Sequence, residues 1–486
     1  MGLLSKYLRE IHNAIISGKT TPLELVKEAI RLAKADENNA FEYIAEKEAL
    51  EKVTHLDESK KDSILYGVPV VIKDNYSTKN IPTTASSDIL NGYVPIFSSE
   101  VVNRLEEAGA IVIGKTTLDE LAMGGSGTSG HKGFTYNPWD KSKKHQIGGS
   151  SCGSAATVSA GIVPFSIGSD TGDSVRKPAS YSGLVGLKPT WGRISRFGLF
   201  QFASSLDHVG YFTRNVYDSA AILNILAGRD EKDMSSSFKE VDDYLKNIES
   251  PIKGKKIAVI KNIVSTISDK TVVETFNKTV DSLKSLGAIV EEVEINLHIL
   301  KAIYPTYIII SCAEAGSNYA SLDGVKFTER IPGKTYEEMM INTRTKCFSP
   351  FIKRRFVIGS YSLLKENADE LFVRAQKCRR LIVNAFNEVL KKYDAIYCPA
   401  SPNPAPLFES FSDVLSDKYL IADSYLAFAN MGGFPSITLP IGFEDGLPFG
   451  GNLTCAPFEE SKLFNIAYNL EKATGLKDLV ANGEDK

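Results

Sequence analysis

Residues 148–180 read GGSSCGSAATVSAGIVPFSIGSDTGDSVRKPAS. The stretch places a Gly/Ser loop, a run of small residues typical of a tightly packed helix, an apolar segment and a second Gly/Ser loop close together along the chain. Glycine lets backbone approach a ligand closely, and successive backbone N–H groups form concavities that bind anions. We therefore expect the two Gly/Ser loops to face a single site.

The composition narrows the class of protein. The chain has 486 residues, of which 43% are hydrophobic and 24% charged, so it is long enough to bury a large core. A net charge of −3 argues against autonomous nucleic-acid binding, because no basic excess exists to displace counterions. Charged residues recur throughout the first twenty positions, which predicts neither a signal peptide nor a membrane span. We expect a cytoplasmic protein.

Cysteine and histidine patterns disfavour metal chemistry. The six cysteines are far apart and form no CxxC pair, which fits a reducing compartment without disulfides or a zinc knuckle. The six histidines form no HExxH pattern, so we expect no metal site. His208 is the only histidine close enough in sequence to compete for a Ser-His-Asp triad. We interpret it as a locally hydrogen-bonded side chain.

Helical and strand patterns alternate along the chain. The first fifty residues read as helices, and Thr21 and Pro22 are typical of the N-cap and first position of one. Helix-to-strand units recur around Gly109 and Gly287, and the charged stretch over 230–256 indicates a surface excursion. Buried strands are expected over residues 68–72, 163–167, 256–260, 395–398 and 436–441.

This alternation predicts an α/β fold with a sheet covered by helices on both faces. No Pro- or Gly/Ser-rich linker divides the chain. We therefore expect one domain over residues 1–486, with a helical segment over 1–60 packed on a core over about 64–214.

The second Gly/Ser loop carries a candidate nucleophile. Its successive backbone N–H groups suit an oxyanion, and Gly172 would permit an unusual backbone conformation beside Ser174. With histidine scarce, the base would be a lysine whose pKa is lowered by burial. Lys73 follows an apolar strand and suits that role. From the residues alone, a solvated lysine at a strand end remains the favoured alternative.

Three ordered motifs together resemble the amidase signature family. They are GVPVVIKDN, GGSSCGSAATVSAG and GSDTGDSVRKPASYSGLVGLKPTWGRISRFG, and the resemblance runs from about Leu23 to the last helix. It implies a mixed sheet within the amidase signature fold and a catalytic set of Lys73, Ser150 and Ser174. In such a site Ser174 attacks an amide, Ser150 follows a cis peptide bond and relays the proton, and Lys73 accepts it.

The resemblance also assigns supporting groups. The oxyanion hole would consist of the backbone N–H groups of Thr171, Gly172, Asp173 and Ser174. Arg176 and Asp207 resemble residues that support the loop, although a purely structural ion pair would look the same. Ser151 and Ser154 would either support the proton relay or, as we favour, cap the helix that follows.

Further segments, among them DELAMGGSGTSG and DSYLAFANMGGFPSITLP, resemble the glutamine-hydrolysing subunits of tRNA-dependent amidotransferases. That likeness implies free glutamine as substrate, two partner subunits, and tRNA contacted through a partner that uses ATP and magnesium. It implies no cofactor in this chain and no membrane. An arginine suits the α-carboxylate and an acidic residue the α-ammonium. The implied pocket residues are Arg355, Asp423, Tyr307, Gly125 and Ser126.

Several residues depart from the family pattern. Cys152 and Asp173 replace glycines, Lys177 replaces a glutamine, and Asn452 stands where glutamine is usual. A carboxylate facing the oxyanion would raise its energy by roughly 4 kcal/mol at 4 Å and an effective dielectric of 20. We therefore predict that Asp173 pairs with Lys177 on the outer side of the loop. A stand-alone amidase on small amides and a catalytically inactive scaffold subunit remain the alternatives.

Overall fold

The computed structural model describes residues 2–327, 329–410, 416 and 418–481. Within these residues, eleven strands form one sheet in the order β1-β3-β2-β4-β6-β5-β10-β11-β9-β7-β8. The strands are β1 (Phe41–Ile44), β2 (Pro69–Lys73), β3 (Ile111–Thr116), β4 (Ser166–Asp170), β5 (Val185–Lys188), β6 (His208–Thr213), β7 (Lys256–Ile260), β8 (Ile289–Val293), β9 (Ala395–Pro399), β10 (Ser436–Glu444) and β11 (Leu447–Thr454).

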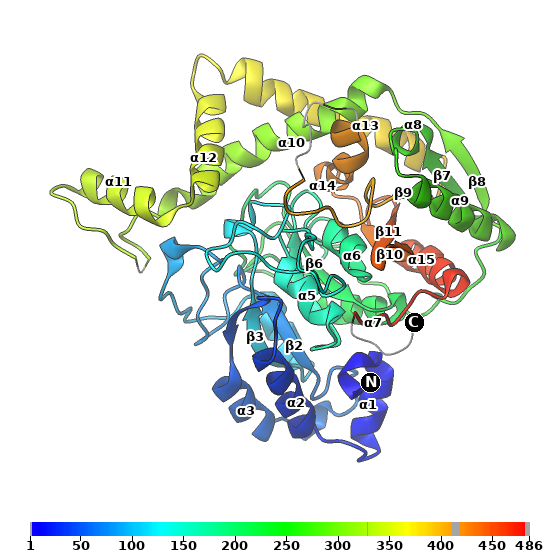
Figure 1. Ribbon diagram of the computed structural model, residues 1–486, viewed down its shortest axis with the longest axis horizontal. Helices are drawn as coiled ribbons and strands as arrows, with labels where there is room; N and C mark the ends of the chain where they lie inside the picture. The colour runs from blue at the N-terminus through cyan, green and yellow to red at the C-terminus, as the bar shows by residue number, and fades with distance from the viewer. Residues whose placement is uncertain (1, 328, 411–415, 417, 482–486) are drawn as a thin grey trace.

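Helices surround this sheet (Figure 1). The α-helices are α1 (Leu8–Ile16), α2 (Pro22–Lys34), α3 (Glu46–Thr54), α4 (Glu100–Glu107), α5 (Cys152–Ser159), α6 (Arg176–Ser182), α7 (Val216–Leu226), α8 (Lys261–Val264), α9 (Lys270–Ser285), α10 (Leu297–Asn318), α11 (Tyr336–Cys347), α12 (Pro350–Leu363), α13 (Arg374–Leu390), α14 (Phe428–Met431) and α15 (Glu460–Thr474). Shorter helical turns are η1 (Leu3–Ser5), η2 (Glu58–Lys60), η3 (Asp88–Leu90), η4 (Glu120–Ala122), η5 (Tyr319–Ser321), η6 (Asp369–Val373), η7 (Lys418–Asp423) and η8 (Tyr425–Ala427).

The sheet is mixed and its centre is covered on both faces. β2 runs parallel to β3 and β4, whereas β6 runs antiparallel to β4 and β5. Every residue of β2, β3 and β4 is buried. Because successive side chains of a strand point to opposite faces, fully buried strands require helices on both sides of the sheet. The chain therefore folds as a single α/β domain.

The N-terminal segment confirms one local prediction and corrects another. The Thr21 side chain accepts a hydrogen bond from the Glu24 backbone N–H, and the Glu24 side chain accepts one from the Thr21 backbone N–H. This pair is a capping box, with Pro22 at the first helical position. The prediction that the first fifty residues are helical is wrong for β1, which pairs antiparallel with β3 at the sheet edge. Phe41, Tyr43 and Ile44 are aromatic or β-branched residues, which pack well on a half-buried pleated edge.

The predicted strands lie close to the observed ones, with one shift. The strand expected over 163–167 begins only at Ser166, because Pro164 has no N–H to donate to a ladder. The charged stretch over 230–256 runs between α7 and β7, but it is anchored by buried Tyr244, Ile248 and Ile252. These three side chains belong to the larger hydrophobic core, so the segment is packed against the domain.

Two hydrophobic clusters position the site. One contains β2, β3 and the N-terminal helices, and the other contains apolar side chains of α10, α12, α13 and α14. In Figure 1 the helices of the second cluster lie at the top of the view, above α5 and α6. A cavity opens between α6 on one side and α10, α12 and η7 on the other.

Candidate active site

Lys73 is the last residue of β2, and its side chain is completely buried. Its Nζ lies 2.8 Å from the Ser150 Oγ, 2.9 Å from the Ser151 Oγ and 2.9 Å from the Ser169 Oγ. Burial lowers the pKa of Lys73 to about 7. A buried lysine with that pKa can hold or release a proton near neutral pH. The alternative favoured from the residues alone, a solvated lysine at the end of a strand, is wrong because the side chain is completely buried.

Ser150 reaches Lys73 from a loop in which glycine is sterically required. The Gly149–Ser150 peptide bond is cis. A Cβ at position 149 would lie 2.0 Å from the Asp119 Oδ2 and 2.9 Å from the Gly127 N. Position 149 therefore accepts only glycine, and the loop before Ser150 packs directly on residues 119–127.

Asp119 organises that neighbouring loop, and sequence reasoning missed it. Its buried carboxylate accepts hydrogen bonds from successive backbone N–H groups at 3.0–3.2 Å; these belong to Ser126, Gly127, Thr128 and Ser129. The Ser129 hydroxyl donates a further bond at 2.8 Å. The signal in the sequence is an acidic residue just before a Gly/Ser-rich turn, where a carboxylate captures N–H groups.

The loop over 171–174 joins β4 to α6 and is held from beneath by Asp170. Arg176 donates to the Asp170 Oδ1 at 2.9 Å and to the Gly172 carbonyl at 2.7 Å. The Val175 N–H donates to the Asp170 Oδ2 at 2.9 Å. Arg176 thus supports the loop that carries Ser174, as the sequence suggested.

The two Gly/Ser loops meet at this point. The backbone N–H of Ser151 donates to the carbonyl of Ser174 at 3.3 Å. Asp207 supports the same loop, because its carboxylate accepts from the Thr171 hydroxyl at 2.7 Å. Burial raises the pKa of Asp207 to about 6.

Gly172 serves a different purpose from the one expected. Its φ lies outside the left-handed region, so no unusual backbone conformation requires glycine there. A Cβ at position 172 would lie 2.9 Å from the Tyr307 ring, which is too close. The expectation of a special conformation is wrong, and the reason for glycine is the approach of α10 to the loop.

The expected capping role of Ser151 and Ser154 is also wrong. Neither hydroxyl caps α5. The Ser151 Oγ accepts from Lys73 and donates to the Ser169 carbonyl at 3.0 Å. The Ser154 Oγ instead lies 2.8 Å from the Thr116 Oγ1 and donates to the Ile167 carbonyl at 2.8 Å. Ser151 therefore joins the lysine network, the alternative left open, while Ser154 ties α5 to the sheet.

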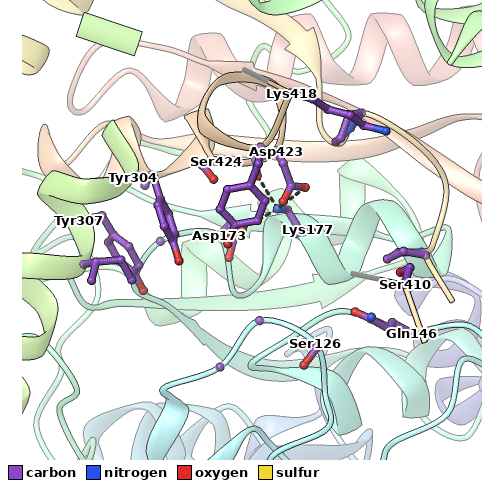
Figure 2. Close-up of a pocket in the computed structure, with 18 of the residues that line it drawn as sticks. Ser126, Gln146, Asp173, Lys177, Tyr304, Tyr307, Ser410, Lys418, Asp423 and Ser424 are labelled. Atoms are coloured by element: carbon purple, nitrogen blue, oxygen red, sulfur yellow. Dashed lines mark hydrogen bonds and ion pairs between the residues drawn. The ribbon is translucent and has the colours of Figure 1, made fainter. Parts of the chain in front are cut away.

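Asp173 and Lys177 do pair, but the pair faces inward. The Lys177 Nζ lies 3.1 Å from the Asp173 Oδ2 and 3.0 Å from the Asp423 Oδ1. All three residues line the cavity rather than the outer side of the loop (Figure 2). The prediction of an outward pair is wrong because Asp423, brought in by η7, offers a second carboxylate on the cavity side.

The cavity has a volume of ≈ 960 Å³ and gathers every residue proposed for the pocket. Its walls include Gly125 and Ser126 from the Asp119 loop, Gly172 and Asp173 from the second Gly/Ser loop, Tyr307 from α10, Arg355 from α12 and Asp423 from η7. In Figure 2 Tyr304 and Tyr307 stand on one side of the pocket, while Gln146 and Ser410 stand on another.

Arg355 lines the cavity from α12. Its guanidinium lies over the rings of Phe351 at 4.8 Å and Phe202 at 5.9 Å. Its Nη1 is buried and has no hydrogen-bond partner among the described residues. A buried N–H without a partner is costly, so the arrangement suits an anion that enters the cavity.

The remaining predictions concern residues away from this network. The Nδ1 of His208 lies 2.7 Å from the carbonyl oxygen of Leu206, which confirms a locally hydrogen-bonded side chain. The described residues contain no group of three His, Cys, Asp or Glu that could hold a metal ion. In the same residues, no helix is both long and apolar enough to cross a membrane.

A family model described as Amidase matches residues 24–464. The chain belongs to the amidase family. It is 40% identical to a glutamyl-tRNA(Gln) amidotransferase subunit of Pediococcus pentosaceus over 482 residues, 98% of each chain. It is 39% identical to the protein of the same name from Persephonella marina over 486 residues, again 98% of each chain.

Solved structures of related proteins have the same fold as this chain. The crystal structure of the glutamyl-tRNA(Gln) amidotransferase subunit from Thermotoga maritima superposes on this chain with a TM-score of 0.80 at 37% identity. The superposition covers 97% of this chain and 95% of that one. The peptide amidase of Stenotrophomonas maltophilia gives a TM-score of 0.79 at 26% identity, covering 97% of both chains. The amidase fold therefore extends over nearly the whole chain.

Proposed function

We propose that the chain is the glutamine-hydrolysing subunit of a tRNA-dependent amidotransferase. It would release ammonia for the conversion of Glu-tRNA(Gln) to Gln-tRNA(Gln). The observation that carries the proposal is a cavity lined by Arg355 and Asp423 together with Asp173, the residue directly before Ser174. The loop that carries Ser174 is hydrogen-bonded to the loop that holds the buried Lys73–Ser150 contact. Identity of 40% over nearly the full length of relatives named as glutamyl-tRNA(Gln) amidotransferase subunits supports it.

In the proposed mechanism Ser174 is the nucleophile. Its Oγ forms a bond to the side-chain amide carbon of glutamine while its proton passes through the Ser150 hydroxyl to neutral Lys73. The backbone N–H groups of the loop from Thr171 to Ser174 stabilise the oxyanion. Lys73 then returns the proton to the leaving nitrogen, the C–N bond breaks, and ammonia departs from a glutamyl ester of Ser174.

Water completes the proposed cycle. It attacks the ester carbonyl while the Ser150–Lys73 relay accepts its proton, and the C–O bond to Ser174 then breaks. Ser174 takes up that proton and glutamate leaves. A lysine whose pKa is about 7 suits both directions of transfer, because either form is accessible near neutral pH.

The cavity supports glutamine through opposite charges on its walls. Arg355 would bind the α-carboxylate through its unpartnered Nη1. Asp423 would bind the α-ammonium, while Tyr307, Gly125 and Ser126 would shape the pocket between them. This division of roles leaves the side-chain amide to reach Ser174.

The proposal includes two partner subunits, one that activates and amidates the tRNA-bound glutamate and a small stabilising one. ATP and magnesium would be used by the first, which would also make most of the tRNA contact. Ammonia release from glutamine by the chain purified with its partners tests the proposal, with and without ATP and Glu-tRNA. Release and Gln-tRNA formation support it; neither activity in an intact complex contradicts it.

A second candidate is a stand-alone amidase that acts on small amides. The cavity volume supports this candidate, because ≈ 960 Å³ lies near the top of the roughly 300–1,000 Å³ range of ligand pockets and has room for amides other than glutamine. Its signature would be hydrolysis of aliphatic amides without partners and without dependence on Arg355. A catalytically inactive scaffold subunit would show neither activity. The Lys177 charge beside Asp173 weakens the argument for inactivity that Asp173 alone would make.

A further inference from the structure

Lys177 joins two cavity walls that are far apart in sequence. It lies in the first turn of α6, directly after the loop that carries Asp173. Its Nζ contacts the Asp173 Oδ2, the Asp423 Oδ1 and the Asp423 carbonyl oxygen. The dashed lines in Figure 2 show this junction between α6 and the end of η7.

These contacts use the whole donor capacity of the lysine. An ammonium has three N–H groups and no acceptor, and the three contacts occupy all of them. Only 10% of the Lys177 side chain is exposed, and its pKa is raised well above the ordinary value by the two carboxylates. Lys177 therefore has no donor left for a substrate and can act only through the groups that it holds.

The two carboxylates keep free acceptors. Asp173 and Asp423 use one side-chain oxygen each for Lys177, and about a quarter of each side chain is exposed, at 25% and 24%. Their second oxygens make no hydrogen bond within the described part of the chain. Two carboxylates and one ammonium carry a net charge of −1, which leaves this wall attractive to one more cation.

We infer that Lys177 is a positioning residue that holds Asp173 and Asp423 together as a two-carboxylate site for the substrate ammonium. The inference rests on the proposed function and adds Asp173 to its ammonium contacts. Because Asp173 belongs to the oxyanion loop, the Lys177 bridge also ties ammonium recognition to the loop that would stabilise the reacting oxygen. An amide without an ammonium would gain nothing from this site.

The test compares glutamine with glutaramate, the same amide and carboxylate without the α-ammonium. The full-length chain is purified with its partner subunits as Lys177→Gln, Lys177→Arg, Asp173→Asn and the double variant Asp173→Asn/Lys177→Gln. Lys462→Gln is the matched control, because Lys462 also bridges two carboxylates, Asp394 and Glu459, each at 3.2 Å and outside the cavity. Calorimetry gives dissociation constants and ammonia release gives kcat and KM.

Lys177→Gln is expected to raise the glutamine KM and Kd about tenfold or more, because the two unbridged carboxylates repel each other and no longer converge on one ammonium. It should change the glutaramate values less than about threefold. Its kcat falls for both amides, because Asp173 beside the oxyanion loop loses its counter-charge. Asp173→Asn weakens glutamine binding only, because the wall becomes neutral. Lys177→Arg retains both carboxylates and most of the glutamine affinity, and Lys462→Gln changes neither substrate.

The double variant gives the sharpest result. Removing Asp173 together with Lys177 restores the net charge of −1, so kcat recovers relative to Lys177→Gln and the cycle is non-additive by about threefold or more. Additive effects on kcat, or equal losses of affinity for glutamine and glutaramate, overturn the bridge. Failure of the unmodified chain to hydrolyse glutamine contradicts the proposed function. In that case the glutamine and glutaramate Kd values of the variants still test whether Lys177 positions the two carboxylates. A chain that binds neither ligand overturns the inference as well.

Discussion

The ammonium nitrogen of Lys73 lies 2.8 Å from the hydroxyl oxygen of Ser150, and both side chains are almost fully buried. Only a lysine that loses its proton near neutrality can take one from a serine at this distance. Burial disfavours the charged amine and lowers the pKa of Lys73 to about 7, which meets this requirement.

The first prediction is a pH dependence set by Lys73. The neutral amine accepts the proton, so kcat/KM should rise with pH below about 7 and level off above it. Lys73→Ala should lower kcat/KM by roughly 10²–10⁴-fold, and Lys73→Arg should not restore it because a guanidinium keeps its proton. A flat profile between about pH 6 and 8 would exclude Lys73 as the base.

The second prediction concerns Ser151, which shares Lys73 with Ser150. Ser151→Ala removes an acceptor that stabilises the charged amine, so kcat should fall about tenfold and the apparent pKa of the profile should decrease. Ser154→Ala, three residues further on in α5, is the control, because it removes two hydrogen bonds without touching Lys73. It should lower the unfolding free energy and leave kcat unchanged. Equal kcat values for the two variants would remove Ser151 from the relay.

The third prediction concerns Asp119, whose carboxylate holds the loop packed on Gly149. Asp119→Asn replaces one acceptor oxygen by an NH₂ that faces backbone N–H groups, so unfolding should cost about 1–3 kcal/mol less and kcat should fall. Asp140 is a matched control, because it accepts backbone N–H bonds from Lys144 and His145 away from the cavity. Asp140→Asn should lower the free energy of unfolding and leave kcat unchanged. Denaturant unfolding measures the first quantity and glutamine kinetics the second.

The fourth prediction separates binding from folding at Arg355. Arg355→Met should raise the glutamine KM by about 10–100-fold, because a charge-assisted contact contributes about 1.5–3 kcal/mol. It should leave the melting temperature unchanged or higher, since Nη1 has no partner in the described residues. Arg379→Met should do the reverse, because Arg379 already donates to Ser205 and to the Met431 carbonyl. A large loss of stability in Arg355→Met would show that Arg355 serves the fold.

The sequence predicted the parts of the fold that long local patterns encode. Apolar runs predicted β2 and β7, and the cap residues predicted the start of α2. It did not predict β5 or β11, in which glycine interrupts the strand signal. At Gly451 a Cβ would lie 2.6 Å from the Tyr397 hydroxyl, so glycine serves contacts between strands that no local pattern reveals.

The site shows the same limit. Ordered motifs pointed to Lys73 and Ser150, and the structure brings these two into contact. The inward orientation of Lys177 was not predictable, because it depends on Asp423, 246 positions away in sequence. The catalytic role of Ser174 stays a prediction.

Isolation of the covalent intermediate tests the central claim most directly. The complex is mixed with glutamine, quenched in acid within a few turnovers, digested and analysed by mass spectrometry, with Lys73→Ala as the variant in which the intermediate should not form. The account predicts a glutamyl group on the peptide that contains Ser174, absent in Ser174→Ala. Glutamine turnover with no adduct there, or with the glutamyl group on another residue, would contradict it.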